Sequence, residues 1–275
     1  MPYTSKKRTV KKREMRKRKI LFVLFSLFFL LVLTVFVMRM SWIQIETVLV
    51  FGNNDVSRST IVNEVNTHTR GSYAGIIPKT NILLLNTEKI SKIITNSHSE
   101  ISSTDIKKKD LQVLEIHVVE RDDTYLFCQK EDCFSVDGSN YIFKKSGRNT
   151  SDSNYFFTSY KQYAIDDTLL EFVDLQELDV LIQSLEIKEL NIVQVKELSP
   201  FTIGLVTKGG TVLLVEKSDN FDEIYSTIVK LLQVKDFSVN KGKGEFEKNY
   251  AYINLQFKNK IFSCLKGEAC VDNYK

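Results

Sequence analysis

Residues 111–121 read LQVLEIHVVER, and this stretch decides the class of fold in the middle of the chain. Leu114, Ile116 and Val118 alternate with Glu115 and His117, so one face of the segment is apolar and the other polar. A period of two in a segment rich in β-branched residues predicts a half-buried β-strand. We expect His117 to lie on the solvent side of that strand.

Two amphipathic helical patterns precede this strand. Residues 57–69 begin with a capping serine, and residues 87–97 begin with Thr87 as the expected cap. Apolar side chains recur at helical spacing in both segments: Ile61, Val62, Val65, Ile90, Ile93 and Ile94. A second strand is expected at 43–53. Two helices on one face of a small mixed sheet predict an α+β domain over residues 41–120.

The N-terminal region joins a basic tail to an apolar run. Residues 6–19 hold ten Lys or Arg against the single acid Glu14, and residues 20–38 contain nothing more polar than Ser26 and Thr34. Nineteen helical residues span about 28 Å, close to the hydrocarbon thickness of a bilayer. We therefore predict a basic cytoplasmic tail over 1–19 and a transmembrane helix over 20–39 that contacts the lipid bilayer.

We expect the apolar run to be an uncleaved anchor rather than a signal peptide, because it is longer than a signal peptide's apolar region and no A-x-A pattern follows it. The basic tail predicts that the N-terminus is cytoplasmic and that residues from about 41 are outside. The whole chain carries +4, of which the tail contributes +9 and Arg39 +1, so residues 40–275 carry −6. A mildly acidic exported part excludes a broad basic face for nucleic acid.

Residues 121–262 are predicted to form a mainly antiparallel β-domain with flanking helices, followed by a C-terminal tail over 263–275. The expected strands are a hairpin at 124–137, a strand after the Asp137-Gly138 turn, strands within 192–216, and a strand at 250–262. The expected helices are 174–186 and 218–234, the second capped by Ser218 or Asp219.

The four cysteines form two close pairs, Cys128/Cys133 and Cys264/Cys270. An even number of paired cysteines outside the membrane favours a local disulfide in each pair. Reduced thiols and a four-thiolate zinc site are the two alternatives.

The stretch YAYINLQFKNKIF at 250–262 predicts a strand that can bind a partner. If this strand ends its sheet, its unpaired backbone groups are a template for a strand of another protein. The candidate partner-binding residues are Tyr252, Asn254, Leu255, Gln256, Phe257 and Lys258. Lys258 and Lys260 favour an acidic partner. The same alternation is also compatible with Ile253, Leu255 and Phe257 being core residues only.

The sequence shows no arrangement of residues typical of an enzyme. The three histidines, His68, His98 and His117, lack the spacing of metal ligands, and Gly-Lys-Gly at 242–244 lacks the context of a phosphate-binding loop. We therefore predict a non-enzymatic protein with no cofactor, no metal and no small-molecule substrate.

The order of these parts resembles the FtsQ/DivIB family of bacterial cell-division proteins, from about residue 10 to 262. The stretches that carry the resemblance are IQIETVLVFGNNDVSRSTIV, GIIPKTNILLLNTEKISKII, LQVLEIHVVERDDTYLF, FSVDGSNYIF and YINLQFKNKIF. Within them, Glu120-Arg121, Val136-Asp137-Gly138 and the terminal strand are the most specific. The family typically ends in a strand similar to Y-I-D-L-R-F, and here Asn254 and Gln256 replace the acid and the base.

The resemblance implies that residues 41–120 form a POTRA domain and 121–262 the family's β-domain. It further implies a non-enzymatic scaffold at the division septum, which links small bitopic partners of the FtsB/DivIC and FtsL types through its last strand. The protein would be a single-pass cell-membrane protein with extracytoplasmic C-terminal domains. The alternative is a POTRA-containing component of envelope assembly or secretion.

Overall fold

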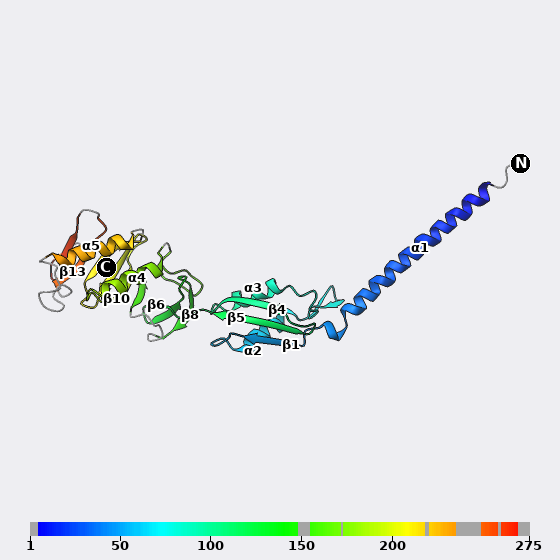
Figure 1. Ribbon diagram of the computed structural model, residues 1–275, viewed down its shortest axis with the longest axis horizontal. Helices are drawn as coiled ribbons and strands as arrows, with labels where there is room; N and C mark the ends of the chain where they lie inside the picture. Colours follow the sequence, from blue (N-terminus) through cyan, green and yellow to red (C-terminus); the bar gives the residue numbers. More distant parts are fainter. Residues whose placement is uncertain are drawn as a thin grey trace. The chain divides into compact units, whose positions relative to one another are not determined.

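The computed structural model describes residues 5–147, 155–171, 173–217, 220–234, 249–257 and 260–268. The chain is a mixed α+β protein that divides into two compact units, Met1–Glu120 and Arg121–Lys275 (Figure 1). The boundary between the units falls between Glu120 and Arg121, at the position expected from the sequence.

The N-terminal helix α1 (Ser5–Met38) includes the basic tail and the apolar run. Its segment Met15–Met38 is long and apolar enough to cross a membrane. At about 1.5 Å per residue these 24 residues rise roughly 36 Å, more than the hydrocarbon core of a bilayer. Its large apolar side chains are exposed, as in a helix whose surroundings are lipid.

A mixed three-stranded sheet forms the centre of the first unit. β1 (Thr47–Phe51) runs parallel to β5 (Val113–Glu120), and β4 (Ile101–Lys108) pairs with the other side of β5 in the antiparallel sense. The other elements are the 3-10 turn η1 (Ser41–Ile43), the helices α2 (Arg58–His68) and α3 (Thr87–Ser97), and the short hairpin of β2 (Ser72–Tyr73) and β3 (Ile77–Pro78).

The predicted apolar face of β5 is the floor of this unit's core. Leu114, Ile116 and Val118 are buried in one cluster with side chains from both helices, which places α2 and α3 on the same face of β5. The helical side chains in that cluster are Ile61, Val65, Ile90 and Ile94. Burying each such side chain contributes about 1.5–3 kcal/mol.

Two details of the first unit differ from the sequence-based expectations. The cap of α3 is Asn86 and not Thr87, because the Asn86 Oδ1 atom accepts the Lys89 N–H at 2.9 Å. The strand β4 was not predicted, since only Ile101 is fully buried along its polar sequence ISSTDIKK. The serine cap of α2 is confirmed: Ser57 Oγ accepts the Thr60 N–H.

The turn after β1 is held by the end of β5. The two carboxylate oxygens of Glu120 accept the backbone N–H groups of Asn54, Asp55 and Val56 at 2.9–3.0 Å. Gly52 lies in the left-handed region at φ +81°, and a Cβ atom there would lie 2.2 Å from the Val118 carbonyl oxygen. Only glycine fits this turn without displacing β5.

The second unit contains a nine-stranded sheet in the order β14-β13-β12-β11-β10-β9-β6-β7-β8. The strands are β6 (Tyr125–Gln129), β7 (Asp132–Val136), β8 (Ile142–Ser146), β9 (Phe156–Ser159), β10 (Ile192–Glu197), β11 (Thr202–Thr207), β12 (Val212–Glu216), β13 (Tyr250–Asn254) and β14 (Phe262–Leu265). Most neighbours are antiparallel, as predicted. The pairs β6–β9, β9–β10 and β12–β13 are parallel.

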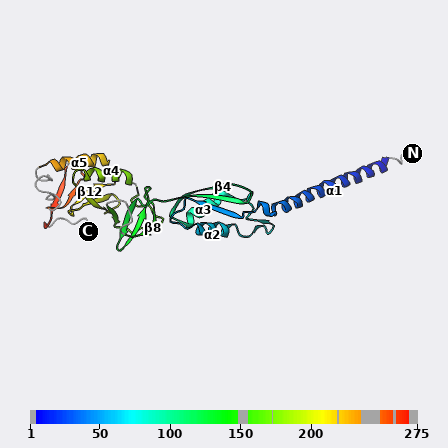
Figure 2. The same ribbon diagram turned by 60° about the horizontal axis from the view of Figure 1, so that its bottom comes forward.

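The helices α4 (Leu175–Glu186) and α5 (Phe221–Gln233) pack against each other and on the sheet (Figure 2). Their predicted apolar stripes are buried in the same core as the strands. The cap of α5 is Asn220, whose Oδ1 accepts the Asp222 N–H, and the predicted Ser218 and Asp219 lie outside the described residues. The strand β9 was not predicted.

Arg121 and Asp137, two of the residues that carry the family resemblance, are joined by a hydrogen bond at the start of this unit. An Arg121 Nη1 donates to Asp137 Oδ2 at 2.5 Å, and the guanidinium lies 4.1 Å from the centre of the Tyr141 ring. Asp137 Oδ1 also accepts the Ser139 and Tyr141 N–H groups. Burial raises the pKa of Asp137, but the hydrogen bonds from Ser139, Tyr141 and Arg121 outweigh it and hold the pKa below its usual range. Asp137 therefore stabilises the predicted β7–β8 turn as a carboxylate.

A buried ion pair lies between β10 and the end of β12. The Glu197 carboxylate is almost fully buried and binds the Lys217 Nζ, the Ser159 hydroxyl and the Tyr163 hydroxyl. A buried carboxylate is tolerated only when its charge and its lone pairs are matched in this way.

We expect Gly52→Ala to lower the free energy of unfolding of the first unit by about 3 kcal/mol, from the positive φ and the overlap with the Val118 carbonyl. Gly71→Ala is the matched control, because Gly71 also has a positive φ of +88° but an added Cβ atom would meet no other atom within 4 Å. We expect this variant to lose about 1 kcal/mol of unfolding free energy. Urea unfolding of the detergent-solubilised full chain, followed by fluorescence of the single tryptophan Trp42, measures both losses. Equal losses of unfolding free energy in the two variants would show that the overlap with the Val118 carbonyl does not contribute.

We expect Lys217→Met to destabilise the second unit by about 3–5 kcal/mol, because it leaves the Glu197 charge buried without a cation. The exposed Lys196 on the same strand as Glu197 provides the control Lys196→Met, with a change below about 0.5 kcal/mol. Hydrogen–deuterium exchange of β10 and β12 in the full chain reports the opening free energy. Adding Glu197→Gln to Lys217→Met should recover part of the loss, and no recovery would show that the ion pair is not the cause.

Candidate partner-binding edge

A strand lies within 250–262 as predicted, but it does not end its sheet, so the condition for partner binding along its own edge is not met. β13 covers only Tyr250–Asn254, with β12 parallel on one side and β14 antiparallel on the other. The alternating sequence showed which faces are buried, but it carries no information on which backbone neighbours a strand has. The brief segment FSCL pairs back onto β13 and becomes an outer strand of the sheet among the described residues.

The strand β13 ends at Asn254 because the Asn254 side chain folds back on the chain. Its Oδ1 atom accepts the Gln256 N–H at 3.0 Å, a local turn that competes with strand pairing. Asn254 and Leu255 are buried, whereas Tyr252 and Gln256 are half-buried. The Gln256 amide donates to the Thr202 hydroxyl at 2.8 Å.

Phe257 and Lys258 are the remaining predicted partner-binding residues, and both follow the end of β13. Phe257 is 52% exposed and packs edge-on against the Phe262 ring, with 5.2 Å between the ring centres. Lys258 lies outside the described residues. Phe257 is thus the predicted residue that is most open to a partner, and it lies beside β14.

In the part of the chain that the structure describes, β14 is one of the two outer strands of the nine-stranded sheet, and β8 is the other. The Lys266 N–H donates to the Asn249 carbonyl at 2.8 Å, on the β13 side. Because successive N–H groups of a strand point to opposite sides, those of Ser263 and Leu265 point outward. The Leu265 N–H has only a long 3.4 Å contact with Glu268 Oε2.

Exposed apolar side chains accompany this outward backbone. We use the name β14 edge for Phe257, Ile261, Phe262, Ser263 and Leu265, of which all but Ser263 are exposed large apolar residues. Outward N–H and C=O groups flanked by apolar side chains can bind an extended peptide as an additional strand. Four residues are too few to display a period of two, which is why the sequence pattern did not predict β14.

The disulfide prediction is confirmed for one cysteine pair. Cys128 and Cys133 form a disulfide, and they lie directly opposite each other on β6 and β7. Cys264 is also disulfide-bonded, and its predicted partner Cys270 lies outside the described residues. Among the residues described, no group of three or more His, Cys, Asp or Glu side chains is arranged to hold a metal ion.

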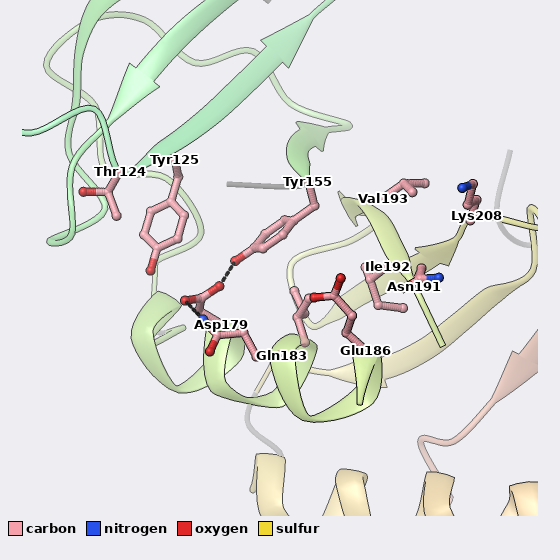
Figure 3. A pocket seen from close by; sticks show the side chains of 11 residues that line it. Thr124, Tyr125, Tyr155, Asp179, Gln183, Glu186, Asn191, Ile192, Val193 and Lys208 are labelled. Atoms are coloured by element: carbon pink, nitrogen blue, oxygen red, sulfur yellow. Dashed lines mark hydrogen bonds between the residues drawn. The ribbon is translucent and has the colours of Figure 1, made fainter. Parts of the chain in front are cut away.

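A pocket of about 500 Å³ lies beside α4 (Figure 3). The Tyr155 hydroxyl donates to Asp179 Oδ1 at 3.1 Å, and the Gln183 amide donates to Asp179 Oδ2 at 2.7 Å. Burial, together with the negative charge of Asp179, raises the pKa of Tyr155 far above its ordinary value. Tyr155 therefore stays a protonated donor at neutral pH, and its bond to Asp179 holds α4 against the strands.

The histidines have separate local settings. His117 lies partly exposed on β5, as expected, and bonds Glu115 Oε1 at 2.7 Å, while His68 bonds Glu64 Oε1 at 3.1 Å on α2. His98 caps the C-terminus of α3, and its Nε2 atom is buried without a hydrogen-bond partner among the described residues. Each histidine thus belongs to its own element.

No protein-family model matches this chain, and a search of curated proteins found no significant match. The function is therefore inferred from the residues and their geometry.

Proposed function

We propose that this protein is a membrane-anchored, non-enzymatic scaffold of the bacterial cell-division complex, with a POTRA-type first unit and an FtsQ/DivIB-type second unit. The observation that carries the proposal is the β14 edge, an outer strand with outward backbone groups and exposed apolar side chains. The apolar helix α1 and the resemblance of the sequence to that family support the same function.

In this proposal α1 holds the chain in the cell membrane with its basic tail in the cytoplasm. The part of the first unit that follows α1 and the whole second unit are then extracytoplasmic. The Cys128–Cys133 disulfide supports that side of the membrane, because disulfides persist in oxidising compartments outside the cytoplasm. The protein acts at the division septum.

The partners are bitopic division proteins of the FtsB/DivIC and FtsL types. A segment of one partner adds to β14, with main-chain hydrogen bonds to Ser263 and to the Leu265 N–H providing affinity, while the Leu265 carbonyl accepts the Glu268 N–H at 3.2 Å. Side-chain contacts with Phe257, Ile261 and Phe262 provide specificity, and the exposed Lys260 favours an acidic segment. Because both proteins are confined to one membrane, a weak contact gains from a high effective concentration.

Depletion of the protein, together with imaging of a fluorescent fusion, tests the cellular role. We expect filaments without septa and a band of the fusion at mid-cell. Normally dividing cells with altered outer-surface proteins would contradict the division role and would favour a POTRA-containing component of envelope assembly or secretion.

The variant Ser263→Pro tests the β14 edge itself. Proline removes an outward N–H, which an edge strand tolerates when that side faces solvent, so the unit should fold while strand addition is blocked. We expect binding of the soluble segment of a DivIC-type partner to weaken at least about tenfold, equivalent to about 1.4 kcal/mol, and septation to fail.

Ser263→Ala keeps the N–H group and is the matched control, with binding close to wild type. Hydrogen–deuterium exchange of β13 verifies that both variants fold. If folded Ser263→Pro binds as tightly as Ser263→Ala, the partner does not use the β14 edge.

A further inference from the structure

The segment between α2 and α3 is fastened to the C-terminal end of α1. The Asn81 side-chain amide donates to the Met38 carbonyl at 2.8 Å, and the Ile82 N–H donates to the Ile43 carbonyl at 3.0 Å. The hairpin strand β3 packs against α1, and Val35 and Met38 are only partly exposed, in contrast to most of that helix. The hairpin therefore lies beside the last turns of the apolar helix.

Large apolar side chains are exposed in the same region of the first unit. We define the membrane-proximal surface by Trp42, Tyr73, Ile76, Leu83, Leu84 and Leu111, all of which are exposed. Leu111 belongs to this region because the neighbouring Gln112 carbonyl accepts the Glu46 N–H at 3.0 Å, close to η1. Their side chains come from three separate segments, 39–46, 70–84 and 108–112, that converge at one end of the β1-β5-β4 sheet.

These three segments are also basic. They contain Arg39, Arg70, Lys79, Lys108 and Lys109 against the acids Glu46 and Asp110, a net charge of +3. The exported part as a whole is acidic, so the positive charge is concentrated where the chain leaves α1.

We propose that the membrane-proximal surface is a lipid-binding surface that rests in the headgroup region of the bilayer crossed by α1. The inference rests on the proposed anchor. The apolar run 20–38 spans about 28 Å, close to a hydrocarbon core of roughly 30 Å, so the residues that follow the C-terminal end of α1 lie at the level of the headgroups. A hairpin packed against that end of α1 lies at the same depth.

The chemistry of the surface fits this position. Tryptophan and tyrosine concentrate at membrane interfaces, where the ring is in an apolar layer and the polar atom stays hydrated. Ile76, Leu83 and Leu84 supply apolar area for the acyl boundary, and the lysines and arginines reach lipid phosphates. A bound protein would also cover apolar residues, but only the bilayer is already placed there by α1.

The consequence is that the first unit is held at the membrane by two attachments. α1 fixes its position, and the membrane-proximal surface fixes which end of its sheet faces the lipid. This limits rotation of the unit about the helix end.

Quenching of tryptophan fluorescence by lipids brominated on their acyl chains tests the proposal in the full chain reconstituted into nanodiscs. Trp42 is the single tryptophan, so wild type reports the end of α1. In a Trp42→Phe background, Tyr73→Trp places the probe on the surface and Phe51→Trp is the control. Both are aromatic replacements at nearly equal exposure, 46% and 45%, and Phe51 lies at the other end of β1, about 13 Å from Thr47.

We expect the Tyr73→Trp variant to be quenched to a degree similar to wild type and at least about threefold more than the Phe51→Trp variant. Adding Ile76→Asp and Leu83→Asp to the Tyr73→Trp variant should reduce its quenching toward the control. If wild type is quenched but Tyr73→Trp matches Phe51→Trp, the lipid-binding surface is refuted and the anchor stands. If wild type itself is not quenched, both the anchor and the lipid-binding surface are refuted.

Discussion

A β-strand carries N–H and C=O groups on two sides, and both sides need partners. In the second unit β13 lies between β12 and β14. The backbone N–H and C=O groups of β13 therefore form hydrogen bonds within the sheet on both sides. Among the described residues, the outer side of β14 is one of the two edges of this sheet, with β8 at the opposite edge. The proposed function depends on this pairing, because it moves the candidate edge from β13 to β14.

The amides at Asn254 and Gln256 have a structural explanation. An acid and a base at these positions could pair with each other or with a partner, whereas amides both donate and accept hydrogen bonds without charge. Asn254 uses its oxygen to end β13, and Gln256 uses its nitrogen to bond β11 through Thr202. Uncharged amides at these two positions thus suit a strand that is enclosed within the sheet.

The adjacent residues Glu120 and Arg121 each stabilise local structure in one of the two units. Glu120 closes the turn after β1 by accepting three backbone N–H groups, and Arg121 binds Asp137 and covers Tyr141. Two adjacent charged residues therefore form their hydrogen bonds in two different units. If the first unit also rests on the lipid surface, the chain is ordered near the membrane by α1 and its adjoining hairpin, and it remains open to partners through the second unit.

The sequence alone predicted the apolar helix, the mixed α+β class, both pairs of amphipathic helices and the turn at Asp137, and it favoured a Cys128–Cys133 disulfide over the two alternatives. Each of these depends on neighbours within a few residues, or on a hydrophobic period that the chain displays directly. The polar β4, the short β9 and β14, and the caps Asn86 and Asn220 were missed or misplaced. Their sequences show little or no burial pattern of their own, or offer two cap residues of similar quality. The open edge could be decided only by tertiary structure, because strand order is set by backbone pairing between segments far apart in the chain, and side-chain alternation does not encode it.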